Sequence, residues 1–145
     1  MNIHYSIRDF MATDLISFSP ETPIETAIKS FLDNKISGAP VIDDGNLVGI
    51  LSEKDCMKTL FESSYYNNLG GLVKEYMSTN LMTVNVHDTL SNVADKFIKS
   101  RFRRFPVMEG DKLVGQISRR DVLRAIDQLS KEEQLKIARA AFDKA

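Results

Sequence analysis

The chain contains few of the residues that build metal sites or covalent cross-links. Among its 145 residues there are one cysteine, Cys56, two histidines and no tryptophan. A single cysteine excludes an internal disulfide framework and a cysteine-based zinc site. His4 and His87 lie in unrelated contexts, neither with a metal-ligand spacing to other candidates, so we interpret both as surface residues. We therefore expect no metal and no catalytic cofactor.

Long apolar stretches and an excess of charge of one sign are also missing. No run approaches the roughly 20 apolar residues that a membrane span requires, and residues 1–14 contain no apolar signal segment. The 19 basic and 20 acidic side chains give a net charge of -1, which provides no global basic field for nucleic acid or an anionic membrane. We expect a cytoplasmic protein with no membrane partner.

The chain does contain an internal repeat with an offset of 66 residues. The stretch GAPVIDDGNLVGILSEKD at 38–55 aligns without a gap with RFPVMEGDKLVGQISRRD at 104–121, and the match extends over 7–60 and 73–126. A serine and an aspartate keep their places as Ser52 and Asp55 in the first copy and Ser118 and Asp121 in the second. Cys56 aligns with Val122, which favours a buried helical position for the thiol. A repeat of this kind indicates that the fold consists of two similar units, whatever the roles of individual residues.

Each copy predicts the same order of elements: strand, helix, strand, strand, helix. Short strands are expected at 15–18 and 81–84. Apolar residues at i, i+3, i+4, i+7 and i+8 from Ile24 and from Leu90 predict amphipathic helices, with Thr22 and Asp88 as N-caps and Glu25 closing a capping box. Turns at 44–45 and 110–111 predict two hairpins, each followed by a helix that begins after a serine.

The same pattern divides the chain into three parts. We predict a first repeat over 1–66, a second over 67–129 and a helical tail over 130–145, which opens with a capping-box pattern at Ser130 and Glu133. Residues 62–71 are predicted to form a flexible crossover. Neither half has enough sheet surface to cover both of its helices, so the halves should pack together.

The repeated motifs resemble those of a known family. These motifs are M-x-T before the first strand, TPIETA, ISGAPVID with FRRFPVME, and LVGILSEKD with LVGQISRRD. They resemble the cystathionine-beta-synthase (CBS) domain, and the tandem copies resemble the CBS pair called a Bateman module. The resemblance implies an α+β fold with two pseudo-symmetric β-α-β-β-α repeats packed sheet to sheet. It also implies two clefts for adenosine-containing ligands and a flat homodimer that forms through the helices.

The serine and aspartate at the start of each second helix suit a sugar phosphate. They provide a hydroxyl, free backbone N–H groups and a carboxylate at one helix N-terminus. A carboxylate can accept hydrogen bonds from both hydroxyls of a ribose, a role that we assign to Asp55 and Asp121. The alternative role is helix capping by the same residues. The local serine–aspartate pattern alone favours capping, whereas the repeat and the family resemblance together favour ribose binding.

The two copies differ just before the strand that begins each hairpin, where 36–38 is ISG and 102–104 is FRR. The resemblance implies that this segment lines the cleft, with the small version near the base and the basic version near phosphates. Guanidinium groups suit phosphate oxygens, although a solvated basic patch with Lys99 and Arg101 is the alternative. The preferred cleft would use Thr22, Ala27, Ile36, Ser37, Gly38, Arg103, Arg104, Gln116, Ser118 and Asp121. The second cleft would use Ile50, Ser52, Asp55, Asp88, Val93 and Phe102. Gln116 departs from the family, which has an apolar residue there, as at Ile50.

These features predict a stand-alone regulatory protein that binds AMP, ADP or ATP, with S-adenosylmethionine as an alternative ligand. It would sense energy or metabolite state and act on a partner protein. An enzyme is not expected, because the sequence has no nucleophile with a plausible base, no metal cluster and no P-loop. A ligand-free dimerisation scaffold stays open. A nucleic-acid binder is suggested by KSRFRRF at 99–105, but the overall acidity argues against it.

Overall fold

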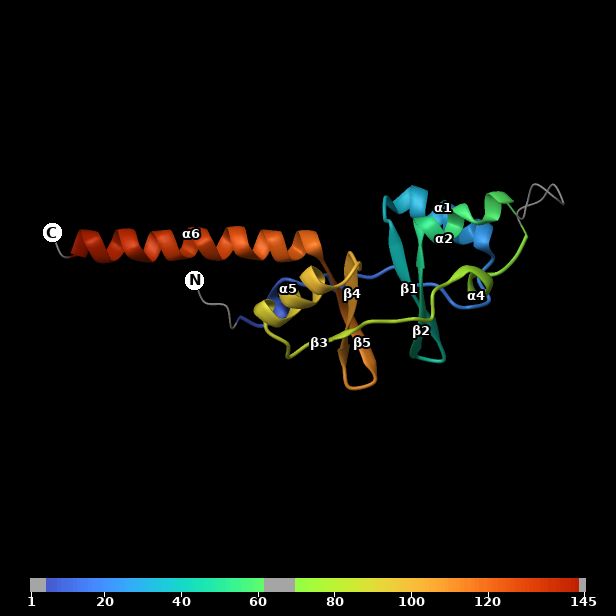
Figure 1. The fold of residues 1–145 in the computed structure, drawn as a ribbon, viewed down its shortest axis with the longest axis horizontal. Coiled ribbons are helices and arrows are strands. Elements are labelled where there is room, and N and C mark those ends of the chain that lie inside the picture. Colours follow the sequence, from blue (N-terminus) through green and yellow to red (C-terminus); the bar gives the residue numbers. More distant parts are fainter. Residues whose placement is uncertain (1–4, 62–69, 144–145) are drawn as a thin grey trace. The chain divides into compact units, whose positions relative to one another are not determined.

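The protein is described here by a computed structural model that covers residues 5–61 and 70–143 (Figure 1). The chain forms two compact units. Unit 1 contains 1–13, 83–110 and 114–145, and unit 2 contains 14–82 and 111–113. Each unit therefore contains most of one repeat together with the leading segment of the other. None of the helices in the described residues is both long enough and apolar enough to cross a membrane.

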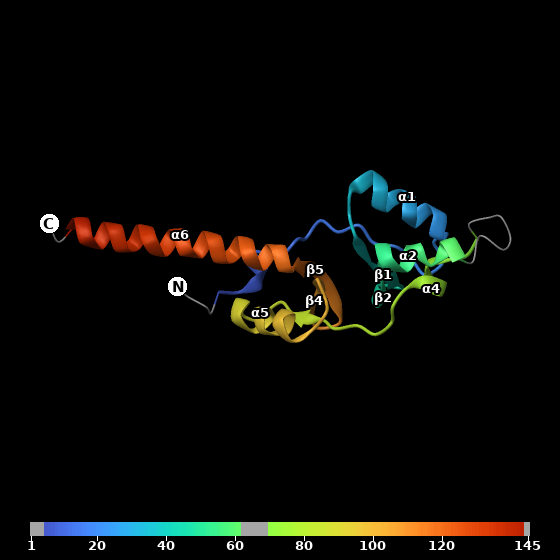
Figure 2. The same cartoon turned by 45° about the horizontal axis from the view of Figure 1, so that its top comes forward.

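Unit 2 contains the body of the first repeat. Its helix α1 (Ile24–Asn34) contacts α2 (Glu53–Met57), and the hairpin strands β1 (Gly38–Asp43) and β2 (Asn46–Ser52) are antiparallel. Figures 1 and 2 both show α1 and α2 on one side of this hairpin. The predicted strand at 15–18 is reduced to a single parallel bridge between Phe18 and Val41. The short helix α4 (Val73–Tyr76) of the second repeat completes this unit, and Val73 is fully buried in it.

Unit 1 repeats the same arrangement. Helix α5 (Leu90–Lys99) contacts α6 (Arg119–Asp143), and a three-stranded sheet has the order β3 (Val84–Asn85), β4 (Arg104–Glu109), β5 (Lys112–Ser118). The parallel pairing of Val84 with Val107 corresponds to the bridge at Phe18 in unit 2. The 3-10 helix η1 (Ile7–Asp9) of the first repeat closes this unit, with Ile7 fully buried. The predicted order of elements is confirmed in the second repeat, with a shorter first strand. In the first repeat the leading strand is only the Phe18–Val41 bridge, and the other elements are confirmed.

Both predicted hairpins form, through two-residue turns with different backbone geometry. In the first, Asp44 and Gly45 both have positive φ angles, of 49° and 80°, as a type I′ turn requires. In the second, Gly110 alone is positive, at 60°, which fits a type II′ turn with glycine first. The order of the two turn residues in the sequence, Asp-Gly against Gly-Asp, accounts for the difference.

Two of the predicted N-caps are wrong. Helix α1 begins after Pro23 without a side-chain cap, because the Thr22 hydroxyl oxygen instead accepts a hydrogen bond from the Ser19 backbone N–H at 3.1 Å. Helix α5 is capped by Thr89, while Asp88 accepts from the Asn85 N–H at 2.9 Å. In both cases the predicted residue caps a turn immediately before the helix.

The C-terminal tail does not begin a new helix at Ser130, as the capping-box pattern suggested. Helix α6 runs without a break from Arg119 to Asp143, and Figures 1 and 2 show it as one continuous rod. Its buried residues end at Leu129, so the second half of the helix adds little to the core of unit 1. Most of the predicted crossover, 62–69, lies outside the described residues.

Candidate functional site

The serine and aspartate of each repeat form a reciprocal pair at the start of a helix. In unit 2 the Asp55 N–H donates to Ser52 Oγ at 3.2 Å, and the Ser52 N–H and hydroxyl each donate to Asp55 Oδ2 at 2.9 Å. In unit 1 the Asp121 N–H donates to Ser118 Oγ at 3.1 Å, and the Ser118 N–H donates to Asp121 Oδ2 at 2.9 Å. The capping alternative is therefore realised in both units, and it fixes the orientation of each carboxylate.

Capping leaves the second oxygen of each carboxylate to a surface cation. Lys58 lies 3.4 Å from Asp55 Oδ1, and Arg124 lies 2.6 Å from Asp121 Oδ1. The aspartate side chains are 14% exposed, whereas Lys58 and Arg124 are 61% and 66% exposed. Because such exposed ion pairs contribute only about 0–1 kcal/mol, a ligand hydroxyl can replace the cation at small cost. Capping and ribose binding are thus compatible roles for one carboxylate.

The leading segment of each repeat pairs with the strand that carries this site in the other repeat. Ala12 and Gln116 exchange backbone hydrogen bonds of 2.8 and 2.9 Å, and Ser78 and Ile50 exchange bonds of 2.8 and 2.9 Å. Neither Ala12 nor Ser78 was predicted from the sequence as a neighbour of the site. The duplicated M-x-T motif, which contains both residues, was the signal in the sequence. Because each motif directly precedes the first strand of its own repeat, it suggested a contact within that repeat and not with the other one.

Glycine permits this close pairing. An added Cβ at Gly49 would lie 2.6 Å from Met77 Sδ, and one at Gly115 would lie 2.7 Å from the Ala12 carbonyl oxygen and 2.9 Å from Met11 Sδ. Both positions therefore need a residue without a side chain. The methionine of each M-x-T motif packs onto the strand that leads to the serine and aspartate.

The residues predicted to surround the base lie in unit 2, before, within and after α1. Lys35 ends that helix in the left-handed conformation, and the Ile36 N–H donates to the Phe31 carbonyl oxygen at 3.2 Å. The Ser37 carbonyl oxygen accepts from the Glu53 N–H at 3.0 Å, which ties this segment to the start of α2. Ile36 and Ser37 are half-buried, whereas Ala27 and Gly38 are buried; Thr22 is half-buried at the start of α1.

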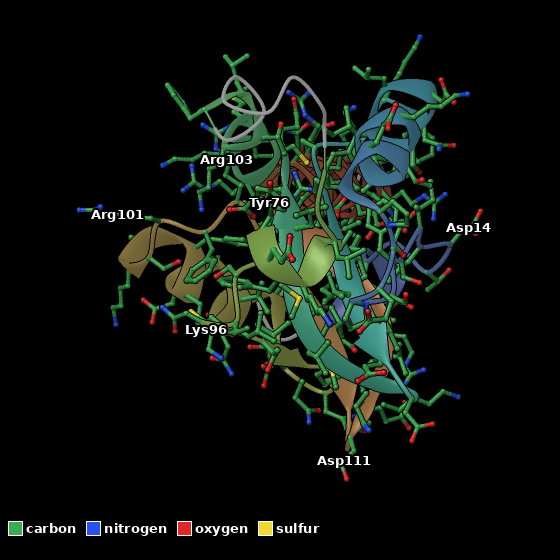
Figure 3. All side chains as sticks on the ribbon, turned by 90° about the vertical axis from the view of Figure 1, so that its right-hand side faces the viewer. Asp14, Tyr76, Lys96, Arg101, Arg103 and Asp111 are labelled. Carbon is green, nitrogen blue, oxygen red and sulfur yellow. The ribbon has the colours of Figure 1, made fainter. Side chains whose placement is uncertain are left out.

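The basic segment at 102–104 has the equivalent position in unit 1. The Arg103 carbonyl oxygen accepts from the Arg119 N–H at 3.0 Å, and the Phe102 carbonyl oxygen accepts from Arg119 Nε at 3.1 Å. Arg103 is exposed and Arg104, the first residue of β4, is half-buried. Figure 3 shows Arg101 pointing away from the end of α5. Of the other residues assigned to the second cleft, Val93 is fully buried in unit 1.

Two observations limit other chemistry at this site. Within residues 5–61 and 70–143, no group of three or more His, Cys, Asp or Glu side chains is placed to hold a metal ion. Burial raises the pKa of the Cys56 thiol from 9.0 to about 11, with smaller contributions from the charges of Asp55 and Glu53. The thiol beside the Asp55 carboxylate is therefore protonated at neutral pH and a poor nucleophile.

Comparison with known proteins identifies the repeats. The model of the CBS domain family matches residues 7–62 and again residues 73–128. The chain belongs to the CBS domain family. The duplicated motifs are thus those of two tandem CBS repeats, in a mixed α+β fold.

Relatives of this CBS pair come from plants, bacteria and archaea. The crystal structure of CBSX2 in complex with AMP superposes with a TM-score of 0.77 at 29% identity, over 87% of this chain and 98% of that one. CBSX2 is a chloroplastic CBS domain-containing protein of Arabidopsis thaliana. YhcV of Bacillus subtilis is 28% identical over 88% of both chains. MJ1225 of Methanocaldococcus jannaschii is 26% identical over 86% of this chain, which spans only 44% of that protein.

Proposed function

We propose that this CBS pair is a regulatory protein that binds an adenosine nucleotide, AMP, ADP or ATP, with Asp121 as the ribose ligand. The observation that carries the proposal is the Asp121 carboxylate: its Oδ2 accepts from the Ser118 N–H, while its Oδ1 contacts the exposed side chain of Arg124. An AMP complex of CBSX2, 29% identical to this chain, supports the choice of an adenosine ligand.

The phosphate part of the proposal rests on Arg103 and Arg104, which stand in unit 1 beside the start of α6. The Arg103 carbonyl oxygen accepts a hydrogen bond from the N–H of Arg119, the first residue of α6. The Arg103 backbone is therefore in contact with the helix that carries Asp121. A guanidinium contact to phosphate is worth about 1.5–3 kcal/mol, which favours AMP over adenosine by roughly 10- to 150-fold. The base would be lined by Thr22, Ala27, Ile36, Ser37 and Gly38 of the first repeat, as the family resemblance implies.

Calorimetric titration with AMP, ADP, ATP, adenosine and S-adenosylmethionine tests this function. We expect saturable binding of at least one adenosine phosphate and weaker binding of adenosine, because adenosine offers nothing to the arginines. GMP is the control for the base, and a short single-stranded oligonucleotide at low and high salt tests the nucleic-acid alternative. Absence of both heat and thermal stabilisation with every adenosine compound would leave the ligand-free scaffold as the better function.

We also propose that the protein acts as a homodimer in the cytoplasm. Large apolar side chains stand exposed at equivalent positions of both units, with exposed fractions between 41% and 82%. They occupy three pairs of aligned positions in the two repeats, 66 residues apart in sequence: Leu32 and Ile98, Met57 and Leu123, Leu60 and Ile126. Isolated exposed apolar residues are common, but the same three positions in two diverged copies indicate a shared contact surface. Light scattering at micromolar concentration tests the oligomeric state.

A further inference from the structure

Arginine is unevenly distributed between the two repeats. Six of the eight arginines of the chain lie in two short segments of unit 1, residues 96–104 and 119–124: Arg101, Arg103, Arg104, Arg119, Arg120 and Arg124. These segments carry eight basic side chains and one acidic side chain, a net charge of +7. The aligned segments of the first repeat, 30–38 and 53–58, carry three basic and three acidic side chains and no arginine. The two copies thus share the serine–aspartate pair but not the charge around it.

The near-zero charge of the whole chain hides this difference. Unit 1 contains 13 basic and 9 acidic side chains, a net charge of +4, and unit 2 contains 6 basic and 11 acidic side chains, a net charge of -5. The acidity that argues against a nucleic-acid ligand at the level of the whole chain therefore belongs to unit 2. Unit 1 has a positive field of its own, which attracts polyanions.

The structure brings the two arginine-rich segments together beside the Asp121 carboxylate, and the six arginines are called here the arginine surface. The Arg119 N–H donates to the Arg103 carbonyl oxygen at 3.0 Å, and Arg119 Nε donates to the Phe102 carbonyl oxygen at 3.1 Å. Arg124 Nη2 donates to Asp121 Oδ1 at 2.6 Å. The segment before β4 and the first turns of α6 therefore form one continuous basic surface, which includes the proposed ribose ligand.

Three arginines of this surface have side chains that are exposed and unpaired. Within residues 5–61 and 70–143, the guanidinium groups of Arg101, Arg103 and Arg120 make no hydrogen bond and no ion pair. Figure 3 shows Arg101 pointing away from the protein. Each guanidinium presents a planar fork of donors that matches phosphate oxygens. A single phosphate reaches only the nearest of these groups, whereas a chain of phosphodiesters can contact several.

An aromatic side chain lies within the same surface. Phe102, between Arg101 and Arg103 in sequence, is half-buried, and its ring packs on Phe105 at 5.9 Å between centroids with a tilt of 45°. The first repeat has Ile36 at the aligned position. Alternating arginine and aromatic residues suit single-stranded nucleic acid, because rings stack on bases while guanidinium groups contact phosphates. This pattern favours a nucleic acid over an acidic protein segment or an anionic membrane.

The Asp121 carboxylate restricts which nucleotide can bind. In its proposed role it accepts hydrogen bonds from both hydroxyls of one ribose. Within an RNA strand only the 3′-terminal nucleotide has both hydroxyls free, because every other 3′ oxygen belongs to a phosphodiester, and DNA lacks the 2′-hydroxyl. The strand leaves that terminal nucleotide through its 5′ phosphate, the group that the proposed function assigns to Arg103 and Arg104.

We propose that the Asp121 site and the arginine surface bind the 3′-terminal adenosine of a single-stranded RNA. This inference rests on the proposed binding of an adenosine nucleotide and extends the ligand beyond one nucleotide. Asp121 accepts from the terminal 2′ and 3′ hydroxyls, and Arg103 contacts the first phosphate. Arg101 and Arg120 contact the phosphodiesters that follow. Free AMP occupies the same site as the RNA end but makes fewer of these contacts.

Fluorescence anisotropy with a short oligoadenylate RNA, labelled at its 5′ end, tests the proposal. We expect the RNA to bind at least about tenfold more tightly than AMP at low salt, and excess AMP to displace it. A phosphate on the 3′ oxygen, or an oligodeoxyadenylate in place of the RNA, should weaken binding about tenfold or more. Each phosphate contact should add about -0.7 to the slope of log affinity against log salt concentration.

Charge removal in the two repeats gives a matched pair of variants. Arg101→Gln combined with Arg120→Gln should weaken RNA binding about tenfold and flatten its salt dependence, while changing the affinity for AMP less than about threefold. Lys35→Gln combined with Lys54→Gln removes the same charge at the aligned positions of unit 2 and should change RNA binding less than about twofold. Asp121→Ala should abolish the preference for a free 3′ end. Thermal unfolding of each variant checks that it is folded.

The alternatives give different results. AMP binding without tighter RNA binding leaves the proposed function in place and overturns this inference. RNA binding that a 3′ phosphate does not weaken and AMP does not displace shows general electrostatic attraction, which also overturns it. Binding to vesicles of anionic phospholipid but not to the RNA would assign the arginine surface to a membrane. If neither the RNA nor any adenosine compound binds, the proposed function fails, and this inference fails with it.

Discussion

The two units fill equivalent cores with different residues. Both repeats keep one helical phenylalanine, Phe31 in unit 2 and Phe97 in unit 1. In unit 2 its ring packs edge-on against Phe18, from the segment before α1, at 5.6 Å between centroids. In unit 1 its ring stacks at 4.3 Å on Phe105, from the hairpin strand β4. Each unit thus contains a pair of packed aromatic rings, but the second ring of the pair comes from a different segment of the repeat.

The exchange is balanced by small residues at the vacated positions. Where unit 2 has Phe18, unit 1 has Val84, and where unit 1 has Phe105, unit 2 has Ala39. All four side chains are buried. Because interiors are close-packed, the added ring at one position must be matched by lost volume at another. At these two pairs of positions the copies share core volume and not residue identity.

The largest expected effect comes from Phe105, which is fully buried. Phe105→Ala removes the stacked ring and should lower the free energy of unfolding by about 3–5 kcal/mol. The double variant Val84→Phe with Phe105→Ala gives unit 1 the arrangement of unit 2 and should recover part of this loss. Urea denaturation measures both. A double variant that is less stable than Phe105→Ala alone would show that the two arrangements are not interchangeable.

The glycines of β2 and β5 sharpen the comparison. A Cβ on Gly115 would meet the Ala12 carbonyl oxygen at 2.7 Å, whereas one on Gly49 would meet first the Met77 sulfur at 2.6 Å. A methionine side chain can move, so the backbone contacts decide the difference: the Ala12 oxygen would lie 2.7 Å from a Cβ on Gly115, and the Ser78 oxygen 3.0 Å from one on Gly49. Both oxygens are fixed by paired backbone hydrogen bonds. Gly115→Ala should therefore cost about 2–3 kcal/mol of stability and Gly49→Ala about 1–2 kcal/mol.

Methionine truncation provides the control for these glycine variants. Met77→Ala should relieve more of the strain in Gly49→Ala than Met11→Ala relieves in Gly115→Ala, because the backbone oxygen that remains lies at 3.0 Å in the first case and at 2.7 Å in the second. Thermal unfolding of the single and double variants gives the coupling energies. Equal coupling in both units would contradict the assignment of the Gly115 strain to the Ala12 backbone.

Local sequence signals predicted the local parts of this fold and site. The hairpin turns, the amphipathic helices and the serine–aspartate pairs follow from residues within a few positions of one another, and each was confirmed as a structural element. Thr22 and Asp88 were wrongly predicted as helix caps because a side-chain oxygen that can cap a helix can also accept a hydrogen bond within a turn. Each residue instead accepts from the N–H three positions before it, in the turn that precedes the helix. The pairing of Ala12 with Gln116 joins residues far apart in sequence, and no local periodicity encodes it.

The two aspartates should differ in nucleotide binding. Asp121→Ala removes the ribose acceptor beside the arginine segment and should lower affinity about five- to 150-fold, equivalent to about 1–3 kcal/mol. Asp55→Ala should lower it much less, since the equivalent segment beside it, Ile36 to Gly38, carries no charge. Calorimetric titration measures both.

Loss of the helix cap is a separate effect of these variants. Ser118→Ala removes the hydroxyl that accepts from the Asp121 N–H but leaves the carboxylate in place, so it is the matched control for capping. Equal losses for Asp121→Ala and Asp55→Ala, or a larger loss for Asp55→Ala, would show that the preferred cleft is assigned wrongly. Because Ser118 also belongs to the preferred cleft, the capping effect is measured by thermal unfolding. If Asp121→Ala and Ser118→Ala lower the melting temperature equally but Asp121→Ala lowers affinity more, the carboxylate itself binds the ligand.

The smallest expected effect is at Cys56, where unit 1 has the equally buried Val122. Cys56→Val should change stability by less than about 1.5 kcal/mol at pH 7, because the side chains are close in volume and the thiol is protonated. At high pH the two proteins should diverge. The folded state holds the thiol proton more tightly than the unfolded state, since burial raises the pKa of Cys56 from 9.0 to about 11. The corresponding stability is fully present below pH 9 and is lost as the pH rises toward 11.

Relative to the valine variant, the native protein should therefore lose on the order of 1 kcal/mol of unfolding free energy between pH 7 and pH 10. Urea denaturation of both proteins at the two pH values isolates this difference, since all lysines and tyrosines are common to both. A stability difference between the two proteins that is the same at pH 7 and pH 10 would mean that the thiol ionises as readily in the folded chain as in the unfolded one. The Cys56 position would then be more open to water than Val122, and the helical surface of unit 2 looser than that of unit 1.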